Sequence, residues 1–247
     1  MHFWIATPGA STRIMTADSE RASALARRIV RCAKCPRLAR WRQAISHQKT
    51  PRFDSEEYWG KPVPGFGDLG AELLIVGLAP AAHGANRTGR MFTGDRSGEW
   101  LFRALHRFGF SDTSVSVSRD DGLVLRDCYV TAAARCAPPS NKPTASELTN
   151  CRSYLEEEFT LLRNVRVVLV LGRIAFDATW STLVGLQLAQ SRHRPRFSHG
   201  AEVDASDRLK LISSYHPSQQ NTFTGKLTEE MFDGVFRRIT KILSESS

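Results

Sequence analysis

Four short, largely apolar segments constrain the fold of this chain more than any other feature of its sequence. They cover residues 73–77, 128–133, 165–171 and 208–213, and segments with a helical spacing of apolar residues lie between them. Strands with little polar alternation are typical of parallel sheets, because helices cover both faces of such a sheet. The alternation of strands and helices therefore predicts a three-layer α/β domain around a parallel sheet.

Helix and turn signals assign residues 18–247 to one domain. Acidic and small residues open a helix predicted over residues 18–30, and an irregular stretch follows over residues 43–70. A capping-box pattern over residues 144–147 starts another helix. Residues 1–17 lack a basic start followed by a long apolar stretch, so we expect a flexible tail rather than a signal peptide.

The segments that follow the four strands are the richest in Gly, Pro, Asn and His. They are the loop 80–95, the loop 135–141, the turn at Gly172 and the loop 216–224. In open parallel sheets a ligand binds outside the carboxyl ends of the strands. Topology and residue chemistry thus predict a functional site at this edge.

Composition narrows the partners and the cellular setting. The 247 residues carry a net charge of +9, which favours DNA, RNA or anionic lipid, although an arginine-rich soluble surface explains the charge as well. No apolar run is long enough to cross a bilayer, and no basic amphipathic anchor is present. We expect a cytoplasmic protein, and in a reducing compartment clustered cysteines are more often metal ligands than disulfides.

Four of the five cysteines form a candidate ligand set. Cys128 lies in an apolar strand and is best explained as a small buried hydrophobe. Cys32 and Cys35 have the tight CxxC spacing of a metal site, and Cys136 and Cys151 would complete four thiolates. Spacing does not separate zinc from an iron–sulfur cluster, and Cys136 and Cys151 can also be unrelated thiols.

The loop 80–95 contains several candidate site residues. It lacks the Lys-Ser/Thr ending of a P-loop, but its glycines allow the backbone to approach a ligand closely. Arg87 and Arg90 can meet phosphates. Phe92 offers a stacking face or belongs to the core, and Asp95 provides a carboxylate or caps the following helix.

One histidine stands out by its position. His216 follows a buried strand, where a catalytic role is more plausible than for an isolated histidine, and His83 remains ambiguous. The other histidines have no comparable context and are taken as structural: His2, His47, His106, His193 and His199.

Several motifs in a fixed order resemble the type-5 (B-type) uracil-DNA glycosylases. The similarity covers roughly residues 31–236. The motifs are Gly77-Leu-Ala-Pro-Ala-Ala-His-Gly84, Asn86-Arg-Thr-Gly-Arg90, Phe92-Thr-Gly-Asp95, Arg135-Cys-Ala-Pro-Pro139, Asn141-Lys-Pro143 and His216…Gln220-Asn-Thr222…Thr224-Gly225. Each motif alone is weak, but their combination is specific.

The resemblance implies a fold, a cofactor and a set of roles. It implies an α/β/α domain with a central four-stranded parallel sheet, a [4Fe–4S] cluster on the four cysteines named above, and removal of damaged bases from DNA in base excision repair. The functional positions of the family correspond to Asp95, Asn141 and His216. Phe92 corresponds to the aromatic residue on which the flipped base stacks.

The expected base pocket is loose. Ala79 stands where sister families carry an acidic or amide residue, and Ala132 stands where they carry an asparagine that reads uracil. Together with His83 and Phe92, Ala79 is assigned to substrate binding. Without a group matched to the pyrimidine edge, discrimination falls, so we expect activity on uracil and on deaminated purines such as hypoxanthine.

The expected partner is DNA. Arg87, Arg90, Ser218, Gln220 and Asn221 are assigned to phosphates or to the space that a flipped base vacates. We expect a bacterial or archaeal monomer that acts on double-stranded DNA with deaminated bases, with single strands as an additional substrate, and that does not bind membranes. The principal alternative is a non-catalytic nucleic-acid-binding protein with a four-cysteine zinc site. A nucleotide hydrolase is disfavoured by the missing P-loop ending.

Overall fold

The computed structural model describes residues 17–245, so the predicted tail lies outside the described residues except for Ala17. A six-stranded sheet with the order β1-β3-β2-β4-β6-β5 forms the centre of this part of the chain. Its four inner strands are parallel, as expected: β2 (Leu73–Gly77), β3 (Cys128–Ala132), β4 (Val167–Leu171) and β6 (Leu209–Ser214).

Two antiparallel edge strands extend the predicted four-stranded sheet. Strand β1 (Phe66–Gly67) pairs with β3, and β5 (Glu202–Ser206) pairs with β6. Both escape a search for apolar runs, because β1 has two residues and β5 is mostly exposed or half-buried. The chain therefore has a mixed sheet with a parallel centre.

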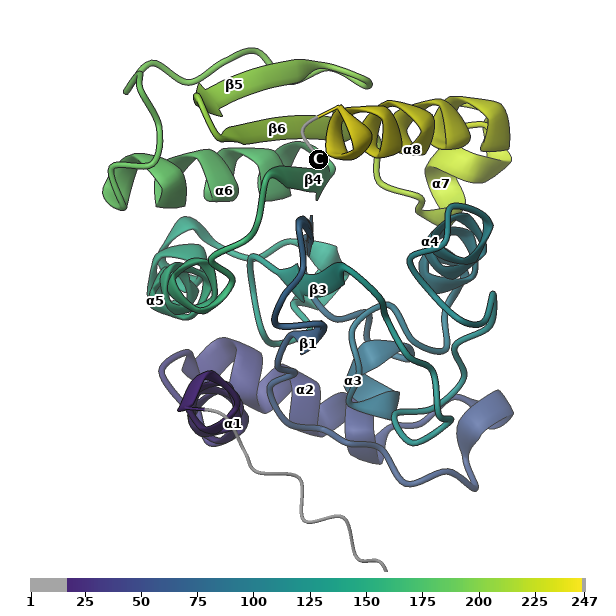
Figure 1. Cartoon of the computed structure of the whole chain (residues 1–247). Coiled ribbons are helices and arrows are strands. Elements are labelled where there is room, and N and C mark those ends of the chain that lie inside the picture. The colour runs from purple at the N-terminus through teal and green to yellow at the C-terminus, as the bar shows by residue number, and fades with distance from the viewer. Residues whose placement is uncertain (1–16, 246–247) are drawn as a thin grey trace, which may run out of the picture.

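Helices cover both faces of the sheet, which confirms the three-layer architecture (Figure 1). Helices α4 (Arg96–Arg107) and α8 (Glu229–Ser244) lie on one face, and α5 (Ala145–Leu161) and α6 (Arg173–Gly185) lie on the other. Two 3₁₀ turns are also present, η1 (Pro51–Phe53) and a second turn described with the active site. Four further α-helices complete the described elements: α1 (Ala17–Val30), α2 (Pro36–His47), α3 (Ala85–Thr88) and α7 (Gln219–Phe223).

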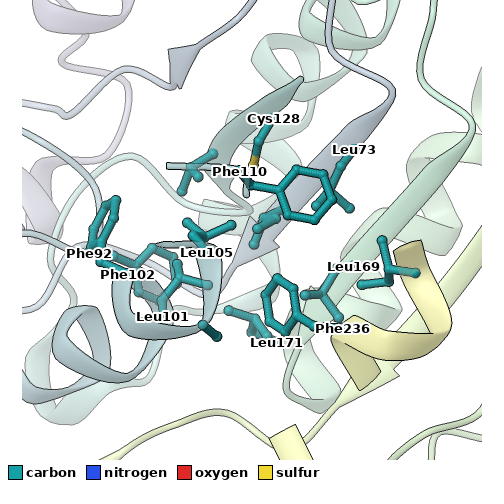
Figure 2. Packing of buried hydrophobic residues seen from close by; sticks show 14 of the residues in the cluster. Leu73, Phe92, Leu101, Phe102, Leu105, Phe110, Cys128, Leu169, Leu171 and Phe236 are labelled. Atoms are coloured by element: carbon teal, nitrogen blue, oxygen red, sulfur yellow. The ribbon is translucent and has the colours of Figure 1, made fainter. Parts of the chain in front are cut away.

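Alternate residues of the strands face two separate cores. Leu73 and Leu169 pack with Leu101 of α4 and Phe236 of α8 (Figure 2). Neighbouring strand residues point the other way, to the side chains of α5 and α6. Burying one such apolar side chain contributes about 1.5–3 kcal/mol, so each face fixes the strand register.

The N-terminal helices form a layer beside α5 (Figure 1). Leu25 and Ile29 of α1 pack against Tyr154 and Leu161 of α5. Helix α2 was not anticipated, and the predicted irregular stretch begins only after His47. Its signal is the proline in its first turn followed by buried residues at helical spacing, Leu38, Arg42 and Ile45.

Candidate active site

The carboxyl ends of the parallel strands bring together the residues predicted from separate loops. A Cβ on Gly77, the last residue of β2, would lie 2.5 Å from the Phe92 ring. A Cβ on Gly172, which follows β4, would lie 3.3 Å from the Cβ of His216, which follows β6. Phe92 and His216, predicted from separate loops, therefore lie at the same edge of the sheet.

Phe92 and His216 form the two walls of this site. Their ring centroids are 6.0 Å apart and their planes are inclined by 25°. Phe92 is buried and adopts a left-handed backbone with φ 55°, which costs energy for a bulky residue and is typical of functional positions. The two flat rings are therefore stacked, with their faces toward each other.

Asp95 caps a helix, which is one of the two interpretations given for it from the sequence. Its Oδ1 accepts a hydrogen bond from the backbone N–H of Gly98 at 2.9 Å, in the first turn of α4. A Cβ on Gly84 would lie 2.2 Å from the other carboxylate oxygen. Burial raises the pKa of Asp95, whereas the N–H groups of Gly98 and Ser97 lower it. The helix cap is therefore confirmed, whereas the role of Asp95 as a site carboxylate stays a prediction.

His216 is held as a neutral imidazole. Enclosure by its neighbours lowers the pKa of His216 to about 4, although part of its surface remains accessible. Its carbonyl oxygen accepts a hydrogen bond from Asn221 Nδ2 at 2.9 Å, and Ser218 caps α7 through Asn221. The residues predicted to contact DNA in this loop therefore also fix the path of the chain around His216.

Asn141 lies apart from this group. It ends the 3₁₀ turn η2 (Pro139–Asn141) after β3, and it is exposed. Ser140 and Asn141 both have left-handed backbones, with φ 53° and 55°. No hydrogen bond among the described residues joins its side chain to Asp95 or His216. Two successive residues in this conformation store strain at the predicted position.

His83 has a partner that the sequence did not reveal. Its Nδ1 lies 3.0 Å from the hydroxyl of Tyr58, which is buried and lies within the predicted irregular stretch. Ala79 lies four residues before it in the same loop and is half-buried. Tyr58 carries no motif, so only the structure connects it with the site.

Arg87 and Arg90 are already paired inside the protein, so the structure does not support the phosphate contacts predicted for them. Both are buried. Arg87 pairs with Glu56 and donates to the carbonyl of His83 at 2.9 Å. Arg90 forms a two-pronged pair with Asp121 at 2.6 and 2.8 Å. Breaking such a buried pair is costly, so these guanidinium groups hold the site loop in place.

Phe223 was missed by sequence reasoning. It ends α7 and is 69% exposed, the most exposed large hydrophobic side chain in residues 17–245. Arg96, next to Asp95, holds its guanidinium 4.5 Å from the ring centroid. Gln220, predicted to contact DNA, is also exposed on this helix. An exposed aromatic side chain beside a candidate site is typical of a residue that contacts a binding partner.

The four candidate thiols converge from three parts of the chain. Cys32 and Cys35 lie between α1 and α2, Cys136 follows β3, and Cys151 lies in α5. Burial raises the pKa of Cys136 to about 12; Arg42 opposes this effect, and the other three thiols add to it. Cys128 is fully buried in β3, as predicted.

Four thiolates are the donor set of both a zinc site and a [4Fe–4S] cluster, so the chemistry of these residues fits either group. No group of three or more His, Cys, Asp or Glu side chains within residues 17–245 is placed to hold one metal ion. Both the cluster implied by the resemblance and the zinc alternative therefore stay predictions.

Comparison with known proteins defines the class to which the fold and site belong. The model of the uracil DNA glycosylase superfamily matches residues 64–240, which contain the four parallel strands and the site loops. No helix in residues 17–245 is both long and apolar enough to span a membrane.

Individual relatives narrow the class to one family. Proteins described as type-5 uracil-DNA glycosylases are 47% identical in Mycobacterium leprae, over 85% of this chain and 91% of that protein, and 50% identical in Thermus thermophilus, over 81% and 89%. A type-4 enzyme of Archaeoglobus fulgidus is 29% identical over 73% of this chain and 81% of that protein. The chain belongs to the type-5 family of the uracil-DNA glycosylase superfamily.

Proposed function

We propose that this chain is a monofunctional DNA glycosylase that hydrolyses the bond between uracil and deoxyribose, and that it also removes hypoxanthine. Removal of uracil in DNA repair follows from membership of the family. The observation that supports the site is the stacking of the Phe92 and His216 rings at the carboxyl edge of the sheet, with the half-buried Asp95 three residues after Phe92. The remaining assignments are argued from the chemistry of these groups.

His216 stabilises the departing base. Cleavage of the C1′–N bond leaves negative charge on the base and positive charge on the sugar. A neutral imidazole in an enclosed site can donate a hydrogen bond to the base oxygen where charge develops, without the cost of reorganising water. Its pKa of about 4 keeps His216 neutral at physiological pH.

Asp95 acts on the sugar side. One carboxylate oxygen is held by the N–H of Gly98, and this bond orients the group. The other oxygen can accept a hydrogen bond from the attacking water or offset the positive charge on the sugar. Asn141 is proposed to assist in placing water or base from the strained turn after β3.

Phe92 supports the extruded base, and the pocket around it has few groups that read the base edge. Ala79 and Ala132 end in methyl groups, which offer no hydrogen bond to a pyrimidine edge. A site without a matched polar group rejects related bases poorly. The pocket is therefore expected to accept hypoxanthine as well as uracil, with His83 held at its rim by Tyr58.

Base flipping determines which DNA is preferred. Removing a base from the stack costs a few kcal/mol and less at a mismatch, so U·G and I·T pairs should be cleaved faster than U·A. Phe223 is exposed beside the site and can fill the vacated stack, as apolar wedges do in other DNA-binding proteins. Single strands need no wedge and remain an additional substrate. One copy of the chain carries all the residues used here.

The four cysteines would hold a [4Fe–4S] cluster with a structural role. Hydrolysis moves no electrons, so the cluster contributes cross-linking rather than chemistry. Cys32 and Cys35 would tie the N-terminal helices to the turn that carries Asn141 and to α5. An absorbance band at about 400 nm in the purified protein, lost in Cys136→Ala, tests this assignment.

A panel of lesion duplexes tests the proposed reaction. Parent, Asp95→Ala and His216→Ala proteins are incubated with U·G, U·A and I·T duplexes, and abasic strands are cleaved with alkali and counted. We expect the parent to act on all three duplexes and both variants to lose activity. Equal cleavage by the parent and both variants would refute the catalytic assignment, and absence of I·T cleavage would refute the broad pocket.

A further inference from the structure

An exposed run of basic residues lies beside the site and has no role in the reaction described above. Residues 191–197, here called the arginine segment, read Ser-Arg-His-Arg-Pro-Arg-Phe and contain no acidic residue. Arg192 and Arg196 are exposed, and neither has an ion pair or hydrogen bond within the part of the chain that the structure describes. They contrast with Arg87 and Arg90, whose charges are neutralised inside the protein.

The far end of the arginine segment is fixed to the strand that leads to His216. Phe197 packs against Tyr215, the residue before His216, with ring centroids 6.2 Å apart, and against Phe176 of α6 at 5.6 Å. Ser198 accepts a hydrogen bond from the Ser213 hydroxyl at 2.6 Å. Arg196 is therefore held close to the carboxyl end of β6.

A second attachment lies next to Gly172. Asp177 of α6 pairs with Arg194 at 3.5 Å and with Arg173 at 3.1 Å. Arg173 directly follows Gly172, whose N–H donates to the carbonyl of Ser214 at 2.8 Å and where an added Cβ would lie 3.3 Å from the Cβ of His216. The single carboxylate of Asp177 cannot balance both Arg173 and Arg194, so a net positive charge remains beside Gly172. The connection between α6 and β5 thus carries unpaired positive charge to the edge that holds the site (Figure 1).

We propose that Arg192 and Arg196, together with Arg173 and Arg194, bind the phosphates of the DNA strand that flanks the extruded nucleotide. This inference rests on the proposed function. Exposed arginines donate to phosphate oxygens and release condensed counterions, which sets orientation without reading sequence. Because the arginine segment lies next to His216, these contacts are on the opposite side of the Phe92–His216 ring pair from the loop 80–95. The guanidinium groups of that loop, on Arg87 and Arg90, are both paired.

Salt dependence of binding separates this role from a structural one. Each phosphate contact contributes about 0.9 to the slope of log K against log salt, so loss of two contacts in Arg192→Gln/Arg196→Gln should lower the slope by about 1.8. At 0.1 M salt this corresponds to roughly 60-fold weaker binding, and the difference should vanish towards 1 M salt. The probe is a labelled duplex with one 2′-fluoro-deoxyuridine opposite G, which binds without being cleaved.

A matched pair of arginines lies at the other end of the sheet. Arg163 and Arg208 line a groove of about 750 Å³ beside the amino ends of the strands, and both are exposed, although Arg163 also pairs with Asp18 at 3.5 Å. Arg163→Gln/Arg208→Gln removes the same charge and should keep the slope and the excision rate of the parent. Thermal unfolding checks that both double variants fold.

The outcomes distinguish the two proposals. A parent protein that excises no uracil refutes the proposed function. A parent that excises uracil while Arg192→Gln/Arg196→Gln keeps the parental slope refutes the arginine segment as the phosphate site. An equal drop of the slope in both double variants also refutes it, because the effect would then follow net charge rather than position.

Discussion

Asp95 should have two separable roles, which a pair of substitutions can measure independently. The carboxylate caps α4 through a 2.9 Å hydrogen bond from Gly98, and its other oxygen, which lies against Gly84, is proposed to act in the reaction. Asp95→Asn keeps an oxygen that accepts this bond but removes the charge, whereas Asp95→Ala removes both. The difference in stability between the variants isolates the cap, and their common loss of activity isolates the charge.

The stability difference follows from the cap geometry. Loss of a helix cap costs about 1 kcal/mol, so Asp95→Asn should melt about 2–4 °C above Asp95→Ala in a chain of this size. Burial raises the pKa of Asp95, so the folded state binds the proton more tightly than the unfolded state. The free energy of unfolding of the parent therefore falls as pH rises through the raised pKa of Asp95. Asp95→Asn has no ionisable group at this position, so it should be at least as stable as the parent at neutral pH.

Activity should respond differently. A positioned carboxylate that handles water contributes about 10²–10⁴-fold, so both variants should lose this factor in single-turnover excision of uracil from a U·G duplex. Thr228 caps α8 with a 3.2 Å bond from Met231 and lies outside the site, so Thr228→Ala should lose similar stability and excise at the parental rate. The reasoning fails if Asp95→Asn excises within about threefold of the parent, or if both Asp95 variants melt at one temperature.

Three further predictions concern other parts of the structure. Arg90→Gln should lower the free energy of unfolding by about 1.5–3 kcal/mol in urea titrations, because it removes the charge-assisted hydrogen bonds to Asp121, and should leave the salt slope of DNA binding unchanged. A drop of about 0.9 in the slope would instead support the predicted phosphate contact. Gly84→Ala should slow excision about 100-fold by displacing Asp95, whereas Gly234→Ala, whose Cβ meets nothing nearer than 3.8 Å, should excise normally. Because the pKa of His216 is lowered from 6.5 to about 4, the unfolded state binds one more proton than the folded state between these pH values. The parent should therefore lose more stability than His216→Asn between pH 7 and pH 4. Equal losses of stability in the two proteins would contradict the lowered pKa.

The sequence was sufficient for the parallel centre of the fold, because the apolar strand segments report burial on both faces. The carboxyl ends of parallel strands share one edge of the sheet. The sequence alone was therefore enough to group Asp95, Phe92 and His216. The capping box at Thr144 and Glu147 was equally local, and the structure contains both of its hydrogen bonds. Features fixed by backbone periodicity or by a single turn were therefore predictable.

Properties that depend on a distant partner were not predictable. A basic motif predicts charge but not burial, and Arg87 and Arg90 are each neutralised by a carboxylate 31 residues away in the sequence. Strand β5 pairs only through its neighbour β6 and lacks an apolar pattern of its own. Tyr58 and Phe223 belong to no motif, and their relevance comes from the tertiary contacts with His83 and Arg96.

The glycines of the site have a different role from the one expected. The glycine-rich loop was expected to let the backbone approach a ligand, yet Gly77, Gly84 and Gly172 each adjoin a side chain of the protein itself. A Cβ at these positions would lie 2.5 Å from Phe92, 2.2 Å from Asp95 and 3.3 Å from His216. Because packed interiors do not yield at the shorter of these distances, a methyl group on Gly77 or Gly84 would displace the ring or the carboxylate. The absence of these methyl groups lets a ring, a carboxylate and an imidazole approach the backbone closely at the three glycines, so the first neighbours of these positions are side chains of the protein.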